Sequence, residues 1–165
     1  MVSSIYSVSQ YRPILDKNDF TIELWLNSKN PNHREFVLGD WDRQGSNGSG
    51  SLGFEVYQGR VHLNANIENT LHHWYYRNTL STKRIKAGQW YHVAIVRNGS
   101  VFSLYLDGSL QGSFSSTRKV NRSSIAFTVG APGDGNWHSF HGQIDDFIII
   151  FVLFFSAILM IGFCL

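Results

Sequence analysis

The sequence predicts an all-β protein built as an antiparallel sandwich or barrel. Hydrophobic residues recur with a period of two along most of the chain, which is typical of strands that bury one face. Glycine-containing pairs that favour tight turns separate these stretches. Before the C-terminal tail, no stretch of ten residues has helical spacing. The chain has 15 glycines and 15% aromatic residues, as expected for strands joined by many turns.

The first half of the chain contains one clear strand and one clear hairpin. In residues 20–27 (FTIELWLN), every second side chain is a large hydrophobic one. Residues 54–66 predict a hairpin that turns at Gln58-Gly59. The returning strand alternates hydrophobic residues with a polar row suited to meeting water or a ligand, namely Arg60, His62, Asn64 and Asn66.

The second half predicts a series of strands joined by short turns. Residues 90–97 and 101–106 should pair through Asn98-Gly99, the strongest hairpin signal in the chain. Asp107-Gly108 should then turn the chain into a further strand at residues 109–114.

Shorter or less regular segments complete the predicted sheets. Strands are expected at residues 124–129 and 140–149. Residues 40–51 form a Gly/Ser-rich loop, and residues 68–88 form a long connection that should contain a strand near His73–Arg77. About ten to thirteen short strands of this kind favour an antiparallel sandwich or barrel.

Five stretches, in this order, resemble successive strands of laminin G-like domains, a branch of the concanavalin A-like jelly-roll superfamily that is often repeated in large extracellular proteins. The most specific motifs are WYHVA, then YLDG, then FHGQIDD. The full set is DFTIELWLN, FVLGDWD, GFEVYQGRVHLNAN, GQWYHVAIVRNGSVFSLYLDGSLQGS and FTVGAPGDGNWHSFHGQIDDFIII. The resemblance implies a jelly-roll sandwich of two antiparallel sheets, one concave and one convex.

The same resemblance divides the chain into a lead-in at residues 1–14, a jelly-roll domain at 15–151 and an apolar tail at 152–165. It does not imply an activity, because the fold hosts lectins, adhesion modules and hydrolases. Relatives of the glucanase type carry an E-x-D-x-x-E run, which this sequence lacks.

The carboxylates of the sequence do not form the pair that glycoside hydrolysis needs, about 5–10 Å apart on one face. Glu55 stands alone between Phe54 and Val56. Asp145 and Asp146 are adjacent, so a regular strand would direct them to opposite faces. Asp40 and Asp42 flank Trp41 at the edge of a loop, where acidic residues are usually solvated. We therefore expect a protein that is not an enzyme.

A zinc site is not expected either. The only cysteine, Cys164, lies in the tail, and His138 and His141 have a spacing that does not bring two imidazoles to one ion at a loop–strand boundary. We expect His92, in WYHVA, to be a packed and hydrogen-bonded residue.

Calcium is the metal that the resemblance implies, since laminin G-like domains often hold one ion near the rim or the convex side, and hard cations prefer oxygen ligands. The candidate ligands are Asp145, Asp146, Asp134 and Asp40, with Asp42 as an alternative to Asp40. The competing interpretation of the GDGN segment around Asp134 is a plain turn.

Glycan binding is the leading functional hypothesis. Sugars stack on aromatic faces and bond to amides, carboxylates and Arg. The polar row and the cluster at residues 73–77 supply these groups on the concave sheet or its rim. The candidate ligand-binding residues are Arg60, His62, Asn64, Asn66, Trp74, Tyr76, Trp41 and Trp137. Two alternatives stay open: that these aromatic residues belong to the core, and that the domain is a structural or protein-interaction adhesion module without a small-molecule ligand.

Charge and flanking segments bear on partners and location. The formal net charge is +2, with both signs scattered, so no nucleic-acid partner is expected. Three sequons, at Asn47, Asn98 and Asn121, agree with an extracellular or cell-surface location. The N-terminus has no signal-peptide core, so a signal would have to lie outside this sequence.

The chain ends in 19 residues without a charge, Phe147 to Leu165. If the last strand keeps residues through Phe151, the remainder spans about 21 Å as a helix, short of the roughly 30 Å hydrocarbon core. We therefore expect, in order of preference, a truncated or altered domain end, a membrane-associating tail at residues 152–165, or a single-span anchor.

Overall fold

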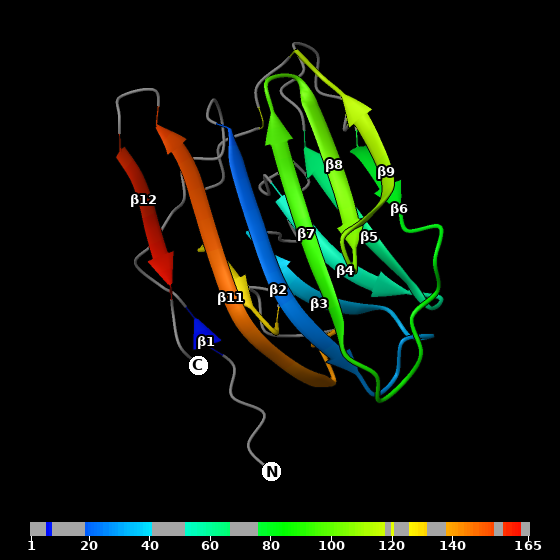
Figure 1. The fold of residues 1–165 in the computed structure, drawn as a ribbon. Coiled ribbons are helices and arrows are strands. Elements are labelled where there is room, and N and C mark those ends of the chain that lie inside the picture. The colour runs from blue at the N-terminus through cyan, green and yellow to red at the C-terminus, as the bar shows by residue number, and fades with distance from the viewer. Residues whose placement is uncertain are drawn as a thin grey trace.

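The computed structural model describes residues 6–7, 19–40, 52–66, 76–117, 120, 126–131, 138–153 and 157–162. These residues form two six-stranded antiparallel sheets packed face to face (Figure 1). The predicted all-β sandwich is therefore confirmed. In the described part of the chain, no helix has the length and apolarity needed to cross a membrane.

The strands of each sheet come from both halves of the chain. Sheet A has the order β1 (Tyr6–Ser7), β10 (Thr128–Val129), β3 (Glu35–Gly39), β4 (Leu52–Tyr57), β5 (Arg60–Asn66) and β6 (Tyr76–Leu80). Sheet B has the order β12 (Ala157–Gly162), β11 (Gly142–Leu153), β2 (Phe20–Ser28), β7 (Tyr91–Asn98), β8 (Val101–Leu106) and β9 (Ser109–Ser115).

The core lies between the sheets and is filled by the alternating hydrophobic residues of the facing strands. The inward residues of β2 are buried, and so are those of β4, β5, β7 and β8. Among the largest fully buried side chains are Phe20, Phe54 and Phe102. Since every second residue of a strand points to the same side, the residues between them form the two outer faces of the sandwich.

Tight turns fix the register of the hairpins. Gln58 and Gly59 have φ values of 53° and 69°, and Asp107 and Gly108 have values of 51° and 73°. Both pairs thus have the two positive φ angles of a type I′ turn, as the sequence predicts. The third turn differs by one residue: Asn98 pairs with Val101, so the loop is Gly99-Ser100, with the positive φ at its first position.

Strand β11 is longer than the predicted strand at residues 140–149, and a bulge divides it. The register against β2 shifts between Asp145 and Ile148. Asp146 has a positive φ of 48° within this bulge. Beyond the bulge, β11 continues to Leu153 and pairs with β12. Part of the apolar tail is therefore the edge strand of sheet B.

Candidate functional site

The outer face of sheet A carries the polar row that the sequence predicts on β5. Arg60, His62 and Asn64 are half-buried there, alternating with the fully buried Val61, Leu63 and Ala65. The β4–β5 hairpin brings Tyr57 opposite Arg60, Glu55 opposite His62 and Gly53 opposite Asn64. We call this set the β4–β5 surface: Tyr57, Glu55, Gly53, Arg60, His62 and Asn64.

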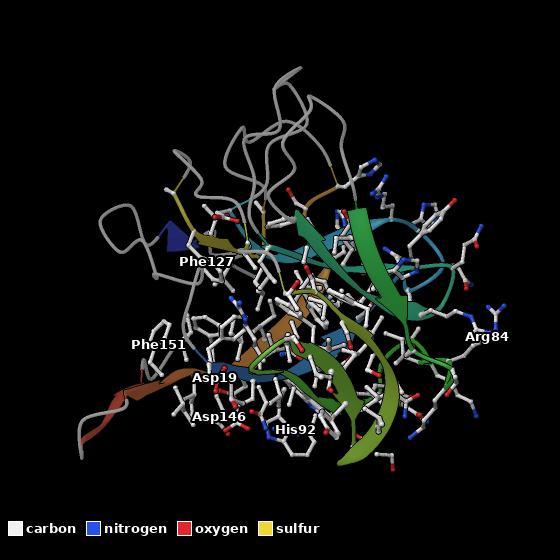
Figure 2. All side chains as sticks on the ribbon, turned by 90° about the horizontal axis from the view of Figure 1, so that it is seen from above. Asp19, Arg84, His92, Phe127, Asp146 and Phe151 are labelled. Atoms are coloured by element: carbon white, nitrogen blue, oxygen red, sulfur yellow. The ribbon has the colours of Figure 1, made fainter. Side chains whose placement is uncertain are left out.

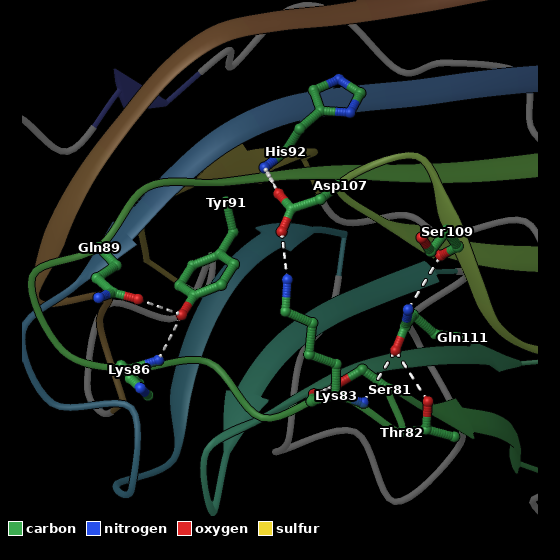
Figure 3. A network of polar contacts seen from close by, with 10 residues as sticks. All are labelled: Ser81, Thr82, Lys83, Lys86, Gln89, Tyr91, His92, Asp107, Ser109 and Gln111. Carbon is green, nitrogen blue, oxygen red and sulfur yellow. Dashed lines mark hydrogen bonds and ion pairs between the residues drawn. The ribbon is translucent and has the colours of Figure 1, made fainter.

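Arg60 is held by the chain that leaves sheet A. Its Nη1 donates to the carbonyl oxygens of Ser81 (2.6 Å) and Thr82 (2.9 Å). The same segment is tied to sheet B, because the Gln111 side-chain oxygen accepts from the Thr82 hydroxyl and the Lys83 backbone N–H (Figure 3). Arg60 thus anchors the connection between the two sheets, which occupies part of its donor capacity.

The Lys83 side chain completes this connection. Its Nζ donates to Asp107 Oδ2 at 2.7 Å, while Asp107 Oδ1 accepts from the backbone N–H of His92 (Figure 3). The hydrogen bond to Asp107 raises the pKa of Lys83. Because this pair is exposed, its role is to position the segment rather than to add much stability.

His62 lies at the centre of the β4–β5 surface. Its ring is 5.9 Å from that of Tyr57, centroid to centroid, and its Nε2 is 3.2 Å from the Tyr57 carbonyl oxygen. Burial lowers the pKa of His62, outweighing the opposite effects of the Tyr57 carbonyl and Glu55. The ring is therefore neutral near pH 7: its Nε2–H donates to the Tyr57 carbonyl oxygen, and its Nδ1 is left as an acceptor.

Glu55 is the acidic residue of this surface, and Arg34 holds both of its oxygens. Arg34 Nε lies 2.8 Å from Oε2, and Nη2 lies 3.0 Å from Oε1. The Glu55 side chain is 9% exposed and the Arg34 side chain 41% exposed. Such a bidentate pair fixes the orientation of the carboxylate beside His62.

The surface continues toward β3 without side chains. Asn64 lies opposite Gly53, and Gly53 lies opposite Gly39, which in turn pairs with Thr128. A Cβ on Gly39 would come within 2.2 Å of the Leu52 carbonyl oxygen, so the approach of β3 to β4 requires glycine there. Between Asn64 and Thr128, the outer face thus carries no side chain at Gly53 and Gly39, and both glycines are buried.

The other predicted ligand-binding residues are placed only in part. Asn66 and Tyr76 lie opposite each other in the β5–β6 pair, and only their backbone belongs to the described structure. Trp41, Trp74 and Trp137 lie outside the described residues. The structure adds Tyr57 and Glu55, which pairing the hairpin about Gln58-Gly59 would have brought opposite the polar row. It also adds Arg34, which precedes β3 and has no such local signal.

The calcium candidates are distributed over both sheets. Asp145 and Asp146 are exposed at the bulge of sheet B. Asp40 follows β3 in sheet A, where its Oδ1 accepts from the Leu52 backbone N–H at 2.8 Å. Asp134 and Asp42 lie outside the described residues. In the part of the chain that the structure describes, no group of three or more His, Cys, Asp or Glu side chains is placed to hold a metal ion.

His92 agrees only partly with its expected role. It is half-buried on the outer face of sheet B, with its ring 5.3 Å from that of Trp25 and its Nε2 3.6 Å from Glu23 Oε2. It therefore packs against neighbours, as expected, but it lies at the surface of the sandwich. Figure 2 shows His92 and Asp146 on the side of sheet B that faces away from sheet A.

Comparison with known proteins gives one family and many similar folds. The family model of the concanavalin A-like lectin/glucanases superfamily named Laminin_G_3 matches residues 4–150. No curated protein matches the chain.

Three solved structures illustrate the shared fold. The sialidase module CBM40 of Ruminococcus gnavus, bound to α2,3-sialyllactose, has a TM-score of 0.65 at 14% identity, over 86% of this chain and 81% of the module. A candidate carbohydrate binding protein of Bacteroides ovatus has a TM-score of 0.62 at 15% identity, over 89% of this chain and 40% of that one. Domains LG4-5 of the mouse laminin α1 chain have a TM-score of 0.60 at 15% identity, over 100% of this chain and 41% of that one. The chain thus spans about two fifths of the last two proteins.

Proposed function

Because this chain belongs to the concanavalin A-like lectin/glucanases superfamily, we propose that it is a non-catalytic binding module that recognises a glycan on the β4–β5 surface. The observation that carries this proposal is the row of Tyr57, His62 and Asn64 on the outer face of sheet A. It offers an aromatic ring that is 37% exposed, a neutral imidazole and an amide, side by side on a rigid hairpin.

These groups match the chemistry of a sugar. The C–H groups on one face of a pyranose ring pack against an aromatic ring, which here is Tyr57. Hydroxyl groups both donate and accept, so they can donate to the remaining nitrogen of neutral His62 and exchange hydrogen bonds in both directions with the amide of Asn64. The sialyllactose held by the Ruminococcus gnavus module supports a glycan as the class of ligand.

The environment of Glu55 favours binding over hydrolysis. A glycosidase needs one carboxyl group to donate a proton and a second to act as nucleophile or base. Arg34 engages both oxygens of Glu55, so this carboxylate is committed as a hydrogen-bond acceptor. We assign Glu55 the role of orienting the surface around His62. We place the whole domain at an extracellular or cell-surface location.

Glycan-array screening followed by calorimetric titration of the best ligand tests the proposal. We expect His62→Ala and Asn64→Ala each to weaken binding about fivefold, the loss of one hydrogen bond. Tyr57→Ala should weaken binding more than Tyr57→Phe, which keeps the ring. Ser115→Ala, an exposed change on β9 of sheet B, is the control. A folded protein that binds no glycan would favour the adhesion-module alternative.

A further inference from the structure

The outer face of sheet B carries an exposed tryptophan in the interior of the sheet. Trp25 is 40% exposed, although it lies on β2, between β11 and β7. Aromatic side chains gain free energy from burial, so an indole left open on a sheet face is available for contact with a ligand.

Two neighbours fix the orientation of this indole. The ring of His92, directly opposite on β7, is tilted by 59° at a centroid distance of 5.3 Å. Glu23, two residues before Trp25, approaches His92 Nε2 with Oε2 at 3.6 Å. Both side chains are about 30% exposed, at 29% and 30% respectively. The three groups therefore support one another before any ligand arrives, which lowers the entropy cost of binding.

The next row of the sheet contains a small residue between larger ones. Ala94 lies between Glu23 on β2 and Tyr105 on β8. It is only 8% exposed, because longer side chains surround it. Tyr105 is half-buried on the same outer face. From the strand spacing and the rise per residue, the Trp25 and Tyr105 backbones are about 12 Å apart, with Glu23 and His92 between them. Two rings with polar groups between them suit a short oligosaccharide.

We propose that this surface, the Trp25 surface (Glu23, Trp25, His92, Ala94 and Tyr105), is a second binding site that takes a neutral oligosaccharide. One sugar ring stacks on Trp25, and its hydroxyls bond to the Glu23 carboxylate and the His92 imidazole. The inference extends the proposed glycan recognition to a separate face of the molecule. The two sites lie on opposite outer faces of the sandwich, so one copy of the domain can bridge two glycan chains.

Charge selects a neutral sugar over an acidic one at this surface. Asp145 lies directly opposite Trp25 on β11, and Asp146 follows it in the bulge. Both aspartates are exposed, and Glu23 is partly exposed. Lys83, whose Nζ reaches Asp107 at the end of β8, is paired with that carboxylate. In the calcium-free protein, a sialic or uronic acid carboxylate would be placed among like charges, and such repulsion discriminates strongly between partners.

Titration calorimetry with cellotetraose, laminaritetraose, maltotetraose and chitotetraose tests the inference, with α2,3-sialyllactose as the acidic comparison. We expect at least one neutral tetrasaccharide to bind. Trp25→Ala should then weaken binding on the order of tenfold, about the contribution of one good aromatic contact. Trp25→Phe should weaken it less, and Glu23→Gln about fivefold. Val101→Ala, an exposed apolar change at the far end of β8, is the matched control and should change affinity less than about twofold.

The variants also separate this inference from the function proposed for sheet A. Tetrasaccharide binding that is lost in His62→Ala but not in Trp25→Ala would overturn the Trp25 surface alone. Binding lost in Trp25→Ala but kept in His62→Ala would support it and show that the β4–β5 surface does not bind that tetrasaccharide. Two further results overturn it: no binding of any neutral tetrasaccharide, or self-association that Trp25→Ala abolishes in the absence of sugar. Thermal melting of each variant shows whether it is folded. If Trp25→Ala does not fold, the affinities of Trp25→Phe and Glu23→Gln test the inference instead.

Discussion

Glu35 is a carboxylate with no exposed surface at one end of the sandwich, and its contacts join the two sheets. Glu35 lies on β3 of sheet A, and 0% of its surface is exposed. Oε2 accepts from the Ser28 hydroxyl of sheet B at 2.6 Å, and Oε1 accepts from the His141 backbone N–H at 3.2 Å. The His141 Nδ1 atom lies 3.5 Å from the same oxygen. These contacts satisfy a group that would otherwise be costly to bury.

Replacing Glu35 should therefore destabilise the fold. Glu35→Ala leaves the buried Ser28 hydroxyl and the His141 N–H without their acceptor, which should cost about 1–3 kcal/mol of unfolding free energy. Urea denaturation of the variant and the wild type measures the difference. Lys86→Ala, at an exposed position, should stay within about 0.5 kcal/mol. Equal effects of the two changes would contradict a structural role for Glu35.

His62 makes the stability of the domain depend on pH. Burial lowers its pKa below the ordinary value of 6.5, so the folded protein binds the proton less readily than the unfolded chain. Above about pH 6.5, His62 is neutral in both states and does not reduce the free energy of unfolding. As the pH falls from there toward the pKa of His62 in the folded protein, the free energy of unfolding decreases. His62→Gln should remove this loss.

Chemical denaturation between about pH 5 and pH 8 measures this effect as the difference between wild type and variant, because the carboxylates contribute equally to both. Below about pH 6.5, the free energy of unfolding should fall more for the wild type than for His62→Gln. Ser115→Ala, a change at an exposed position of β9 that removes no titratable group, should give curves parallel to those of the wild type. Parallel curves for His62→Gln as well would show that burial does not shift this histidine.

At the scale of single elements, the sequence predicts strands well where one face is buried and the turn is local. Residues 20–27 and the Gln58-Gly59 hairpin are examples, because alternation and turn chemistry act over a few residues. Strand β3 escapes the same pattern, since all five of its residues are buried. Strand β10 has only two residues and depends on β1 and β3 as partners. Long-range pairing of that kind has no local signature.

The candidate sites follow the same division. The alternation of β5 correctly places Arg60, His62 and Asn64 on one outer face. Sequence alone does not show that Arg60 is engaged by Ser81, because that contact joins residues 21 positions apart. The same alternation places Trp25 outside the core, but the closeness of His92 and Glu23 depends on the register between β2 and β7.

The bulge of β11 supports the calcium proposal. It interrupts the alternation that would direct neighbouring aspartates to opposite faces, and both Asp145 and Asp146 are exposed there. Asp145 Oδ1 also accepts from the Asp146 backbone N–H at 2.9 Å, which brings the carboxylate over the bulge. We propose that Ca²⁺ binds these carboxylates, since hard cations prefer such oxygens.

Thermal melting in Ca²⁺ and in EDTA tests that proposal. A bound ion stabilises only the folded state, so the melting temperature should rise with Ca²⁺ concentration. Asp145→Asn should reduce the increase, whereas Glu23→Gln on the neighbouring strand should leave it largely intact. An unchanged melting temperature in EDTA and in excess Ca²⁺ would exclude a site with useful affinity.

At the scale of the whole molecule, β12 is the edge strand of sheet B and consists of AILMIG. An apolar edge strand presents unpaired backbone groups to other chains and promotes association. Strand β11 must be kept through Leu153, because Phe151 pairs with Phe20 and is part of the core. Deletion of residues 154–165 therefore removes the edge strand and spares the sandwich.

We expect this truncated chain to melt cooperatively and to remain monomeric at concentrations where the full chain associates. Light scattering coupled to size-exclusion chromatography measures the association, and circular dichroism follows the melting. A matched truncation before Phe151 should unfold the domain, because it removes a buried aromatic residue and the end of β11, at a cost of about 3–5 kcal/mol for the side chain alone. A full-length chain that is already monomeric, or a 154–165 deletion that does not fold, would show that β12 is an integral part of the sandwich.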